Sequence, residues 1–579
     1  MLFAIALWMT HGAYAQLNDR FYGSGYPPFA QNAGAYASNI HVAWRQVQKF
    51  PSSSYNWNSV DSLIQTNQSA GLRTMITLRC THPITVEDST PGTCAYIFDH
   101  GTTDNNSSWA PQGADTTRWE NFISALVERY DGDGINDMPG LIYPVRQWHI
   151  GQEWQRIWCS SYPDTSLSIA QEFVRYVNMT YDAIKNQQSN SEVSFAGIDT
   201  RHQSEAFYDG YFTGQTTLCI SPNCSTQFNL TPSEFASTPN FLQNRRNVMY
   251  IFKNARFDEV DVHAYGRWGN IPDVVRWFND SSQNKPVIFM EGGGPFCKAC
   301  ERIYHSVNDT DGRLPAPLVR DNASYVVYYF ITGFASGVKK QHWHIGPEYN
   351  AWGPIWGDLD LKSINFVSKP SFYVYRWLAK TLFSNANADT VVKIPESNTN
   401  LYHYQIQPLG LNVIWSTTAV DSFIVNGTGT LYRWDIPTTC NSVYPTACDS
   451  VVRTSSMTIS GATTITLIDG VPVFYSWGNV LTEVSESRSF IPTTPTLYQN
   501  YPNPFNPTTK LSFVIGHSSL VSLKVFDVLG REVATLVDEE LNPGEHSVVF
   551  NAKGLVSGVY FYRLTTPTFS QTKSMAVIK

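Results

Sequence analysis

Two glutamates stand at the carboxyl ends of short apolar runs and could act together on one bond. Glu153 follows the run 145–150 after a glycine and an amide, and Glu291 follows the run 286–290 directly, with three glycines behind it. Apolar runs of this length are typical of buried β-strands. A strand that ends in a carboxylate can place an acid over the mouth of a barrel. A pair of such carboxylates is the machinery that hydrolyses glycosidic bonds.

The elements that would position these glutamates follow a regular alternation. Between about residues 20 and 380, β-runs alternate with helical stretches, which is typical of a βα architecture. The predicted strands are 21–26, 40–45, 73–80, the run before Glu153, 193–199, 260–265, 286–291 and 340–346, and the clearest helices are 59–70, 117–130, 173–187 and 324–336. Eight such units predict a (β/α)₈ barrel with its site at the carboxyl ends of the strands.

The order of these features resembles the retaining glycosidases of clan A. That resemblance rests on the glutamates after the fourth and seventh strands, on His263-Ala264-Tyr265 in the sixth and on Trp343 in the eighth. It implies that Glu153 is the general acid/base and Glu291 the nucleophile of a double-displacement reaction on β-glycosidic bonds. The expected substrate is a polysaccharide or oligosaccharide.

Several further residues form the predicted substrate site. The resemblance assigns His263 and Tyr265, which share one strand face, to the nucleophile or the sugar, and Trp343 to a sugar platform. Arg79, at the end of the third strand, could hold a sugar or orient Glu291, and a salt bridge to the barrel wall is the alternative. The remaining predicted substrate-binding residues are Trp148, Gln152 and Trp154.

Gln152 departs from the clan pattern, which has asparagine directly before the acid/base. Its extra methylene moves the amide by about one bond and changes the usual contact to the sugar 2-hydroxyl. This difference motivates an alternative from another class of protein, namely a catalytically inactive carbohydrate-binding surface protein on a glycosidase-like barrel.

The segment Asp131-Gly132-Asp133-Gly134-Ile135-Asn136-Asp137 alternates carboxylates with glycines. Such spacing is found in calcium loops, so Asp131, Asp133 and Asp137 are candidate ligands of a structural calcium ion. The segment is no EF-hand, because Ile142 stands where the twelfth-position carboxylate belongs. A capped helix end that runs into a polar turn explains the pattern as well. No cofactor is expected to be required for the reaction.

Composition excludes some classes of partner. The 579 residues carry a formal net charge of −8, which argues against nucleic acid and against anionic membranes as partners. Charged residues make up only 15% of the chain, while 17 Trp, 31 Tyr and 32 Phe supply rings that suit both cores and sugar stacking. No apolar run is long enough to span a bilayer. We expect a monomer.

The amino terminus and the cysteines indicate an exported protein. Residues 1–15 read as a signal peptide, with an apolar run followed by Ala13-Tyr14-Ala15 as a small-x-small cleavage site. Nine cysteines fit an oxidising compartment. Three pairs are close enough in sequence to close short loops: Cys219/Cys224, Cys297/Cys300 and Cys440/Cys448. We expect Cys297 and Cys300 to form a disulfide that shapes the loop after Glu291.

Beyond the barrel, assigned to residues 16–381, the pattern changes to short alternating strands. Residues 382–484 predict a small accessory β-sandwich packed on the barrel, and the Ser-, Thr- and Pro-rich segment 485–496 predicts a linker. Residues 497–579 contain Tyr501-Pro502-Asn503-Pro504-Phe505-Asn506-Pro507 and closely resemble the sorting domain of the type IX secretion system. That resemblance implies a seven-stranded immunoglobulin-like sandwich, the type IX machinery as partner, and export through the periplasm to the medium or the cell surface.

Overall fold

The structure is a computed structural model that describes most of the chain. The described residues are 21–24, 30–31, 33–49, 53–80, 111, 113–151, 168–199, 217–219, 227–229, 239–264, 268–292, 296–297, 302–303, 316–344, 370–383, 388–407, 409–439, 450–481, 496–497, 500, 503–515, 519–541, 544–567 and 569–578. They divide into two compact units, residues 1–482 and 483–579.

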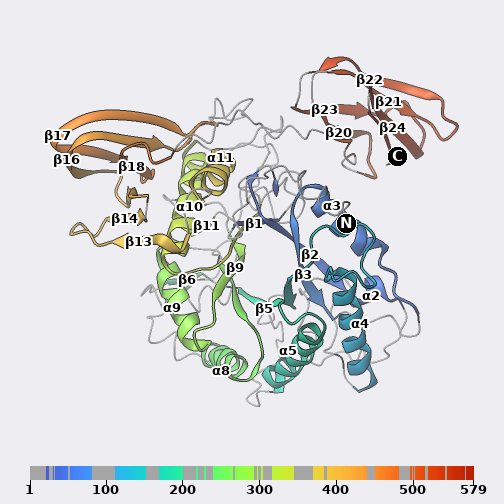
Figure 1. Cartoon of the computed structure of the whole chain (residues 1–579), viewed down its shortest axis with the longest axis horizontal. Coiled ribbons are helices and arrows are strands. Elements are labelled where there is room, and N and C mark those ends of the chain that lie inside the picture. Colours follow the sequence, from blue (N-terminus) through green and yellow to red (C-terminus); the bar gives the residue numbers. More distant parts are fainter. Residues whose placement is uncertain are drawn as a thin grey trace, which may run out of the picture. The chain divides into compact units, whose positions relative to one another are not determined.

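The first unit contains a closed barrel of eight parallel strands, which confirms the predicted (β/α)₈ barrel (Figure 1). In chain order the strands are β1 (Phe21–Ser24), β2 (Ala37–Ala43), β3 (Arg73–Arg79), β4 (Gln147–Ile150), β5 (Glu192–Asp199), β8 (Glu259–Ala264), β9 (Val287–Gly292) and β12 (Gln341–His344). The sequence placed each of them within a few residues. The second strand begins earlier than expected, at Ala37, and it ends at Ala43, because Trp44 and Arg45 belong to a short helix, α2 (Trp44–Val47).

Helices cover the outside of this barrel (Figure 1). They are α3 (Asn58–Ser69), α4 (Ala114–Tyr130), α5 (Ser168–Gln187), α8 (Pro239–Asn254), α9 (Ile271–Ser281), α10 (Ala316–Ala335) and α11 (Pro370–Trp377). Shorter elements are β6 (Thr217–Cys219), β7 (Gln227–Asn229), η1 (Trp268–Asn270), β10 (Phe296–Cys297), β11 (Arg302–Ile303), η3 (Leu378–Leu382) and η4 (Ala388–Thr390). None of the helices in the described part of the chain is long and apolar enough to cross a membrane.

Alternation along the strands separates the interior of the barrel from the layer under the helices. Val260 and Val262 of β8 pack in the large hydrophobic core that the helices cover. A smaller apolar cluster fills the middle of the barrel and consists of Tyr22, Ala37, Met75, Ile288 and Met290. The barrel is therefore a packed core rather than a pore, as expected for this fold.

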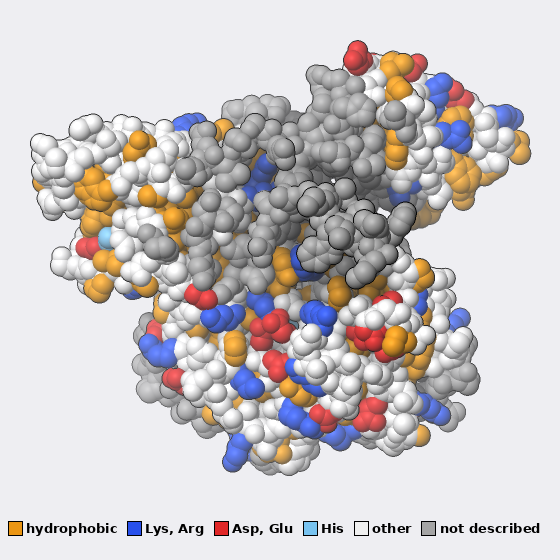
Figure 2. All heavy atoms as spheres, in the orientation of Figure 1, with side chains coloured by type: hydrophobic (Ala, Val, Ile, Leu, Met, Phe, Trp, Pro, Cys, Tyr) orange, Lys and Arg blue, Asp and Glu red, His pale blue; other side chains and the backbone are white. Residues whose placement is uncertain are grey.

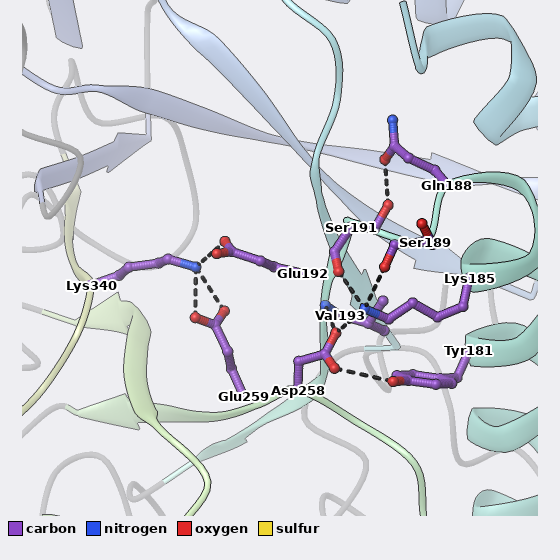
Figure 3. A network of polar contacts seen from close by, with 10 residues as sticks. All are labelled: Tyr181, Lys185, Gln188, Ser189, Ser191, Glu192, Val193, Asp258, Glu259 and Lys340. Atoms are coloured by element: carbon purple, nitrogen blue, oxygen red, sulfur yellow. Dashed lines mark hydrogen bonds and ion pairs between the residues drawn. The ribbon is translucent and has the colours of Figure 1, made fainter. Parts of the chain in front are cut away.

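A polar network closes the floor of the barrel, at the amino ends of the strands (Figure 3). Lys340, just before β12, places its Nζ 2.6 Å from Glu192 Oε2 and 2.7 Å from Glu259 Oε1. Gln147 donates to Glu192 Oε2 at 3.0 Å and accepts from the Tyr22 hydroxyl at 2.6 Å. One cation and its polar neighbours thus join five of the eight strands.

The accessory domain is built from one antiparallel sheet of six strands. They are β13 (Val391–Ile394), β14 (Leu401–Ile406), β15 (Leu411–Ser416), β16 (Val420–Asp435), β17 (Arg453–Ile468) and β18 (Val473–Trp477). Residues 420–430 of β16 extend past β18, and they fold over β14 and β15, because Val425 packs in one cluster with Leu401 and Ile414. The sheet therefore closes around its own core as a β-sandwich, as the sequence predicted.

The outer face of this sandwich packs on the barrel through aromatic residues. The ring of Trp415 lies 5.4 Å from that of Trp268 and 4.8 Å from that of Tyr328 on α10, measured between centroids. Tyr328 also donates its hydroxyl to the carbonyl oxygen of Gly470, and Arg320 Nη1 lies 2.6 Å from Asp469 Oδ2. The two parts of residues 1–482 thus share one hydrophobic core.

The second unit is a separate β-sandwich with its own core. One sheet holds β19 (Thr496–Leu497), β20 (Thr508–Ile515) and β23 (Gly544–Asn551). The other sheet holds β21 (Ser519–Phe526), β22 (Glu532–Leu541), β24 (Gly558–Thr566) and β25 (Phe569–Val577). The described residues of this unit thus form the seven strands that the sequence predicted.

The barrel floor yields a test of stability. Lys340→Met should lower the free energy of unfolding by about 3 kcal/mol, because it leaves the carboxylate of Glu259, whose side chain is 11% exposed, without its counter-charge. Lys339→Met is the matched control, since Lys339 Nζ lies 3.0 Å from Asp389 Oδ1 in an exposed pair. Such pairs contribute less than about 1 kcal/mol. Urea unfolding followed by tryptophan fluorescence measures both; equal losses would contradict the role of the floor.

Candidate functional site

Three polar side chains meet inside the barrel near the carboxyl ends of the strands. Asp261 of β8 is fully buried, and His149 of β4 and His263 of β8 are 3% and 2% exposed. The Nε2 atom of His149 lies 2.9 Å from Asp261 Oδ2, and that of His263 lies 3.4 Å from the same oxygen. Two imidazoles therefore converge on one carboxylate.

The charge of this carboxylate follows from its neighbours. Burial opposes ionisation of Asp261, but His149 and then His263 outweigh that effect and lower its pKa from 3.8 to about 2. Asp261 therefore stays ionised at any pH above about 4. It also accepts the backbone N–H of Met290 at 2.8 Å, so a single side chain joins β4, β8 and β9.

The ladder between β8 and β9 contains a β-bulge just before Glu291. Asp261 pairs with Ile288, yet His263, two residues on, pairs with Glu291, three residues on. The amide of Met290 lies within this irregular stretch, and Asp261 binds it. A bulge changes the phase of alternation along a strand. The Cα of residue 291 thereby comes into register with His263, a residue of the interior face.

The residue after Glu291 supports this phase. Gly292 pairs with Ala264, and a Cβ at position 292 would lie 2.1 Å from the Tyr329 hydroxyl on α10. Position 292 therefore faces the helix layer. Glycine suits position 292, because any side chain there would force the buried Tyr329 ring to move.

A second bulge lies on the other side of β8. Between Phe195 and Ile198 the register of β5 against β8 shifts by one residue. Gly197 lies in this bulge, and a Cβ there would be 1.8 Å from His263 Nε2 and 2.5 Å from Asp261 Oδ2. Glycine at 197 is thus what leaves room for the carboxylate and its imidazole.

The predicted catalytic residues are only partly described. Gln152, Glu153, Trp154 and Tyr265 lie outside the described residues, which reach Gly151 at the end of β4. The backbone of Glu291 is described, as the last residue but one of β9. The assignment of these residues to catalysis or substrate binding stays a prediction.

Two of the predicted sugar contacts are corrected, because their rings lie behind the barrel wall. Trp148 and Trp343 are each 1% exposed and belong to the core between the sheet and the helices. The Trp343 ring packs against those of Tyr325 and Tyr329 on α10, with centroids 5.8 and 5.5 Å apart. Alternation turns both tryptophans outward, since His149 and His342 beside them take the interior positions.

Arg79 and His263 lie on the interior face. Arg79 ends β3 in alternation with Met75 and Thr77, and it is half-buried. Its contact with a sugar stays a prediction.

The sequence pattern predicted no role for His149 or Asp261. The signal that could have found Asp261 is its spacing of two from His263 in an otherwise apolar strand, which puts both on one face.

The acidic loop after α4 brings its three carboxylates together. Asp131, Asp133 and Asp137 each offer an oxygen within 4.8 Å of the others. Burial, then the charge of Asp133, raise the pKa of Asp131. The carboxylates also accept backbone N–H groups: Asp137 accepts those of Gly132 and Gly134 at 3.0 and 2.8 Å. Both predicted explanations, a structural calcium ion and a capped polar turn, fit this geometry, and calcium stays a prediction.

The cysteines of the loop after Glu291 are described only in part. The backbone of Cys297 pairs with that of Arg302 in the small hairpin of β10 and β11. Cys300 lies outside the described residues, so the disulfide stays a prediction. The signal peptide 1–15 also lies outside the described residues.

In class, the chain is a (β/α)₈-barrel protein with an accessory β-sandwich and a carboxyl-terminal β-sandwich. Residues 499–579 match the family model of the secretion system C-terminal sorting domain. This confirms the predicted type IX sorting domain, which marks proteins for export to the cell surface or the outside. No curated protein matches the chain in sequence.

Solved structures similar to this chain include glycoside hydrolases. A family 39 glycoside hydrolase from the gut symbiont Bacteroides cellulosilyticus is 11% identical, with 80% of this chain and 82% of that chain covered and a TM-score of 0.48. A family 44 xyloglucanase from Paenibacillus polymyxa is 10% identical, with 79% and 96% covered and a TM-score of 0.39. An endo-β-1,4-mannanase from Thermotoga petrophila is 12% identical, with 96% and 97% covered and a TM-score of 0.36.

The Asp261 cluster yields a pH-dependent prediction. The pKa of about 2 in the folded state lies below the ordinary 3.8, so ionised Asp261 stabilises the fold above about pH 4. This contribution, about 2 kcal/mol, is lost as the pH falls from 4 toward 2. Asp261→Asn should therefore lower the free energy of unfolding at pH 7, and its difference from the wild type should shrink at pH 3.

Urea unfolding at both pH values measures this effect. Asp280→Asn, the same substitution at an exposed position of α9, serves as the control and should change neither value. A difference between Asp261→Asn and the wild type that stays constant from pH 7 to pH 3 would show that the charge of Asp261 does not stabilise the fold.

Proposed function

We propose that this chain is a secreted retaining β-glycosidase that acts on a plant or microbial polysaccharide. The observation that carries the proposal is the bulge in β9, which brings residue 291 into register with the interior residue His263. Glu153 follows the end of β4 by three residues, and the carboxyl ends of parallel strands meet on one rim of a barrel. The proposal thus has one glutamate after the fourth strand and one at the end of the seventh.

The reaction follows from these two carboxyl groups. A retaining mechanism needs them about 5–5.5 Å apart, one ionised and one protonated. Glu291 attacks the anomeric carbon while Glu153 protonates the leaving oxygen. Glu153 then takes a proton from the water that releases the sugar from Glu291. The sugar keeps its anomeric configuration because the carbon is inverted twice.

The polar cluster below the rim has a positioning role in this proposal. His149 precedes Glu153 by four residues, and Met290, whose N–H Asp261 accepts, precedes Glu291 directly. An ionised, fully buried Asp261 holds both strands, and it fixes the bulge through the Met290 amide. A mobile bulge would let residue 291 slip out of register with His263.

The experiment that tests the activity is a hydrolysis screen of the full chain. Aryl β-glycosides, β-glucan, xylan and mannan are the substrates, with reducing sugar as the readout and proton NMR of the first anomer released. Release of the β anomer supports the proposal. Binding of these polymers without hydrolysis would favour the inactive carbohydrate-binding protein, which Gln152 in the place of asparagine motivates.

The two glutamates should respond differently to removal. Glu291→Ala should abolish turnover of every substrate, because no covalent intermediate can form. Glu153→Ala should lower kcat by about 10²- to 10⁴-fold on substrates with poor leaving groups, which need an acid. It should spare the first step on activated aryl glycosides, and azide should rescue the second step.

Glu120→Ala, on the outer helix α4, is the control and should keep wild-type kinetics. Steady-state and burst kinetics on activated and unactivated substrates decide the assignment. Equal losses on both kinds of substrate in Glu153→Ala would rule out the acid/base role.

The carboxyl-terminal unit should be dispensable for catalysis, because it has its own hydrophobic core. A chain that ends at residue 482 should keep the wild-type kcat/KM and should accumulate in the periplasm of a host with a type IX system. Immunoblots of medium and periplasm, with kinetics on the purified chain, measure both. Unchanged release of the shortened chain into the medium would refute the role of this unit in export.

A further inference from the structure

A pocket of about 450 Å³ lies on the accessory sandwich, away from the barrel interior. It lies between β14 and β15 on one side and the folded-over part of β16 on the other. Trp477, Tyr475, Phe423, Gln405 and Asn412 contribute to its wall, and all five occupy the inner face of the sheet by their register. A volume of this order is typical of small-molecule sites.

Trp477 is the residue of this pocket that most needs an explanation. It ends β18 on the inner face of the sandwich, yet it is 42% exposed. A Cβ at Gly427 would lie 2.3 Å from Trp477 Cζ2, and a Cβ at Gly429 would lie 3.8 Å from Cε3. Two edges of the six-membered ring of the indole thus lie over the two glycines of β16. The glycines let the ring rest on the strand, with an exposed surface turned to the pocket.

Two further rings stand beside Trp477 in the pocket wall. The Phe423 and Tyr475 centroids are 6.0 Å apart, and the Phe423 centroid lies 5.2 Å from that of His403. Tyr475 is 4% exposed, and burial raises the pKa of its hydroxyl, which therefore stays protonated. These packed rings form an apolar side of the pocket.

A polar network behind the pocket holds its amide groups in place. His403 Nδ1 lies 2.7 Å from Glu396 Oε1, and its Nε2 lies 3.0 Å from Asn412 Oδ1 and 3.3 Å from the Tyr475 hydroxyl. Gln405 Nε2 donates to Asn412 Oδ1 at 3.4 Å. The amides of Gln405 and Asn412 are therefore oriented without a ligand, and each has donors and acceptors.

The pocket is uncharged. Among the described residues that line it, none is Lys, Arg, Asp, Glu or His. Figure 2 shows few charged side chains on the viewed face of the accessory domain, which is mostly uncharged polar and hydrophobic. A ligand with a formal charge would find no partner here. An aromatic platform beside neutral amides fits a ligand with a C–H face and a rim of hydroxyl groups.

We propose that this pocket binds a neutral sugar unit of a polysaccharide as a second, non-catalytic site. The sugar ring stacks on the exposed surface of Trp477, and its hydroxyls exchange hydrogen bonds with the amides of Gln405 and Asn412. Because the accessory domain shares a core with the barrel, the bound polymer stays close to the barrel. The site does not depend on catalysis, so it stands or falls separately from the hydrolase proposal.

Affinity electrophoresis tests the site without any need for turnover. Full-length chains that all carry Glu291→Ala, which prevents cleavage of the polymer, run in gels containing mixed-linkage β-glucan, xyloglucan, xylan or glucomannan. Retardation by at least one neutral polymer is expected for the chain with an intact pocket. Trp477→Ala should weaken that retardation about tenfold, the equivalent of one lost stacking contact.

Two further variants keep the test decisive. Gln405→Ala should weaken the retardation several-fold while leaving the aromatic platform, and circular dichroism of both pocket variants should match the parent. Val420→Ala, on β16 and 70% exposed but outside the pocket, should not change the retardation. Equal retardation of the parent and Trp477→Ala, or no retardation of the parent by any of the four polymers, would overturn the proposal. Trp477-dependent retardation by polygalacturonate instead would overturn the assignment to a neutral sugar.

Discussion

The buried carboxylate of Asp261 is the constraint on which the upper half of the barrel depends. Removing a carboxylate from water costs several kcal/mol unless charges and hydrogen bonds replace its hydration. Here His149, His263 and the Met290 N–H replace it, and each comes with a requirement on the backbone. The amide is within reach because β9 has a bulge, and the imidazole of His263 has room because position 197 is a glycine. One charge thus explains two irregularities of the sheet, and those irregularities set the register of residue 291.

The polar residues of the barrel interior form two groups with different roles. At the floor, Lys340 neutralises Glu192 and Glu259 and joins the strand ends. Above it, the apolar cluster around Met75 fills the barrel, and above that lies the Asp261 layer. Lys340 lies in contact with both floor carboxylates, so the charges of the floor are largely balanced where they lie, and the floor can serve closure of the barrel while the upper layer positions the residues of the rim. This division agrees with the rule that the carboxyl ends of barrel strands carry chemistry and the amino ends carry stability.

The sequence was sufficient to predict the order of the helices and strands, but it was not sufficient to predict which way individual aromatic side chains point. All eight barrel strands could be predicted, because hydrophobic runs and helical periodicity are properties of short segments. Trp343 was expected in the site and lies under α10, because a shift of one residue in the phase of a strand exchanges its two faces. The bulge before Glu291 could not be predicted, since it depends on the Met290 amide, which binds a side chain 29 residues earlier in the chain. The importance of Asp261 was missed for the same reason.

The accessory sheet shows how the high aromatic content divides between two uses. Along β15 and β18 successive residues face opposite sides, so Trp415 packs on Trp268 of the barrel while Tyr475 and Trp477 face the inner pocket. The outer rings are buried in the core that the accessory domain shares with the barrel, and they hold these two parts of residues 1–482 together. The inner Trp477 keeps 42% of its surface exposed although its backbone pairs with that of Leu431 on β16. An aromatic ring that rests on glycines and stays exposed to solvent adds little to the stability of the fold. Binding of a ligand would explain why such a ring stands at the mouth of a neutral pocket.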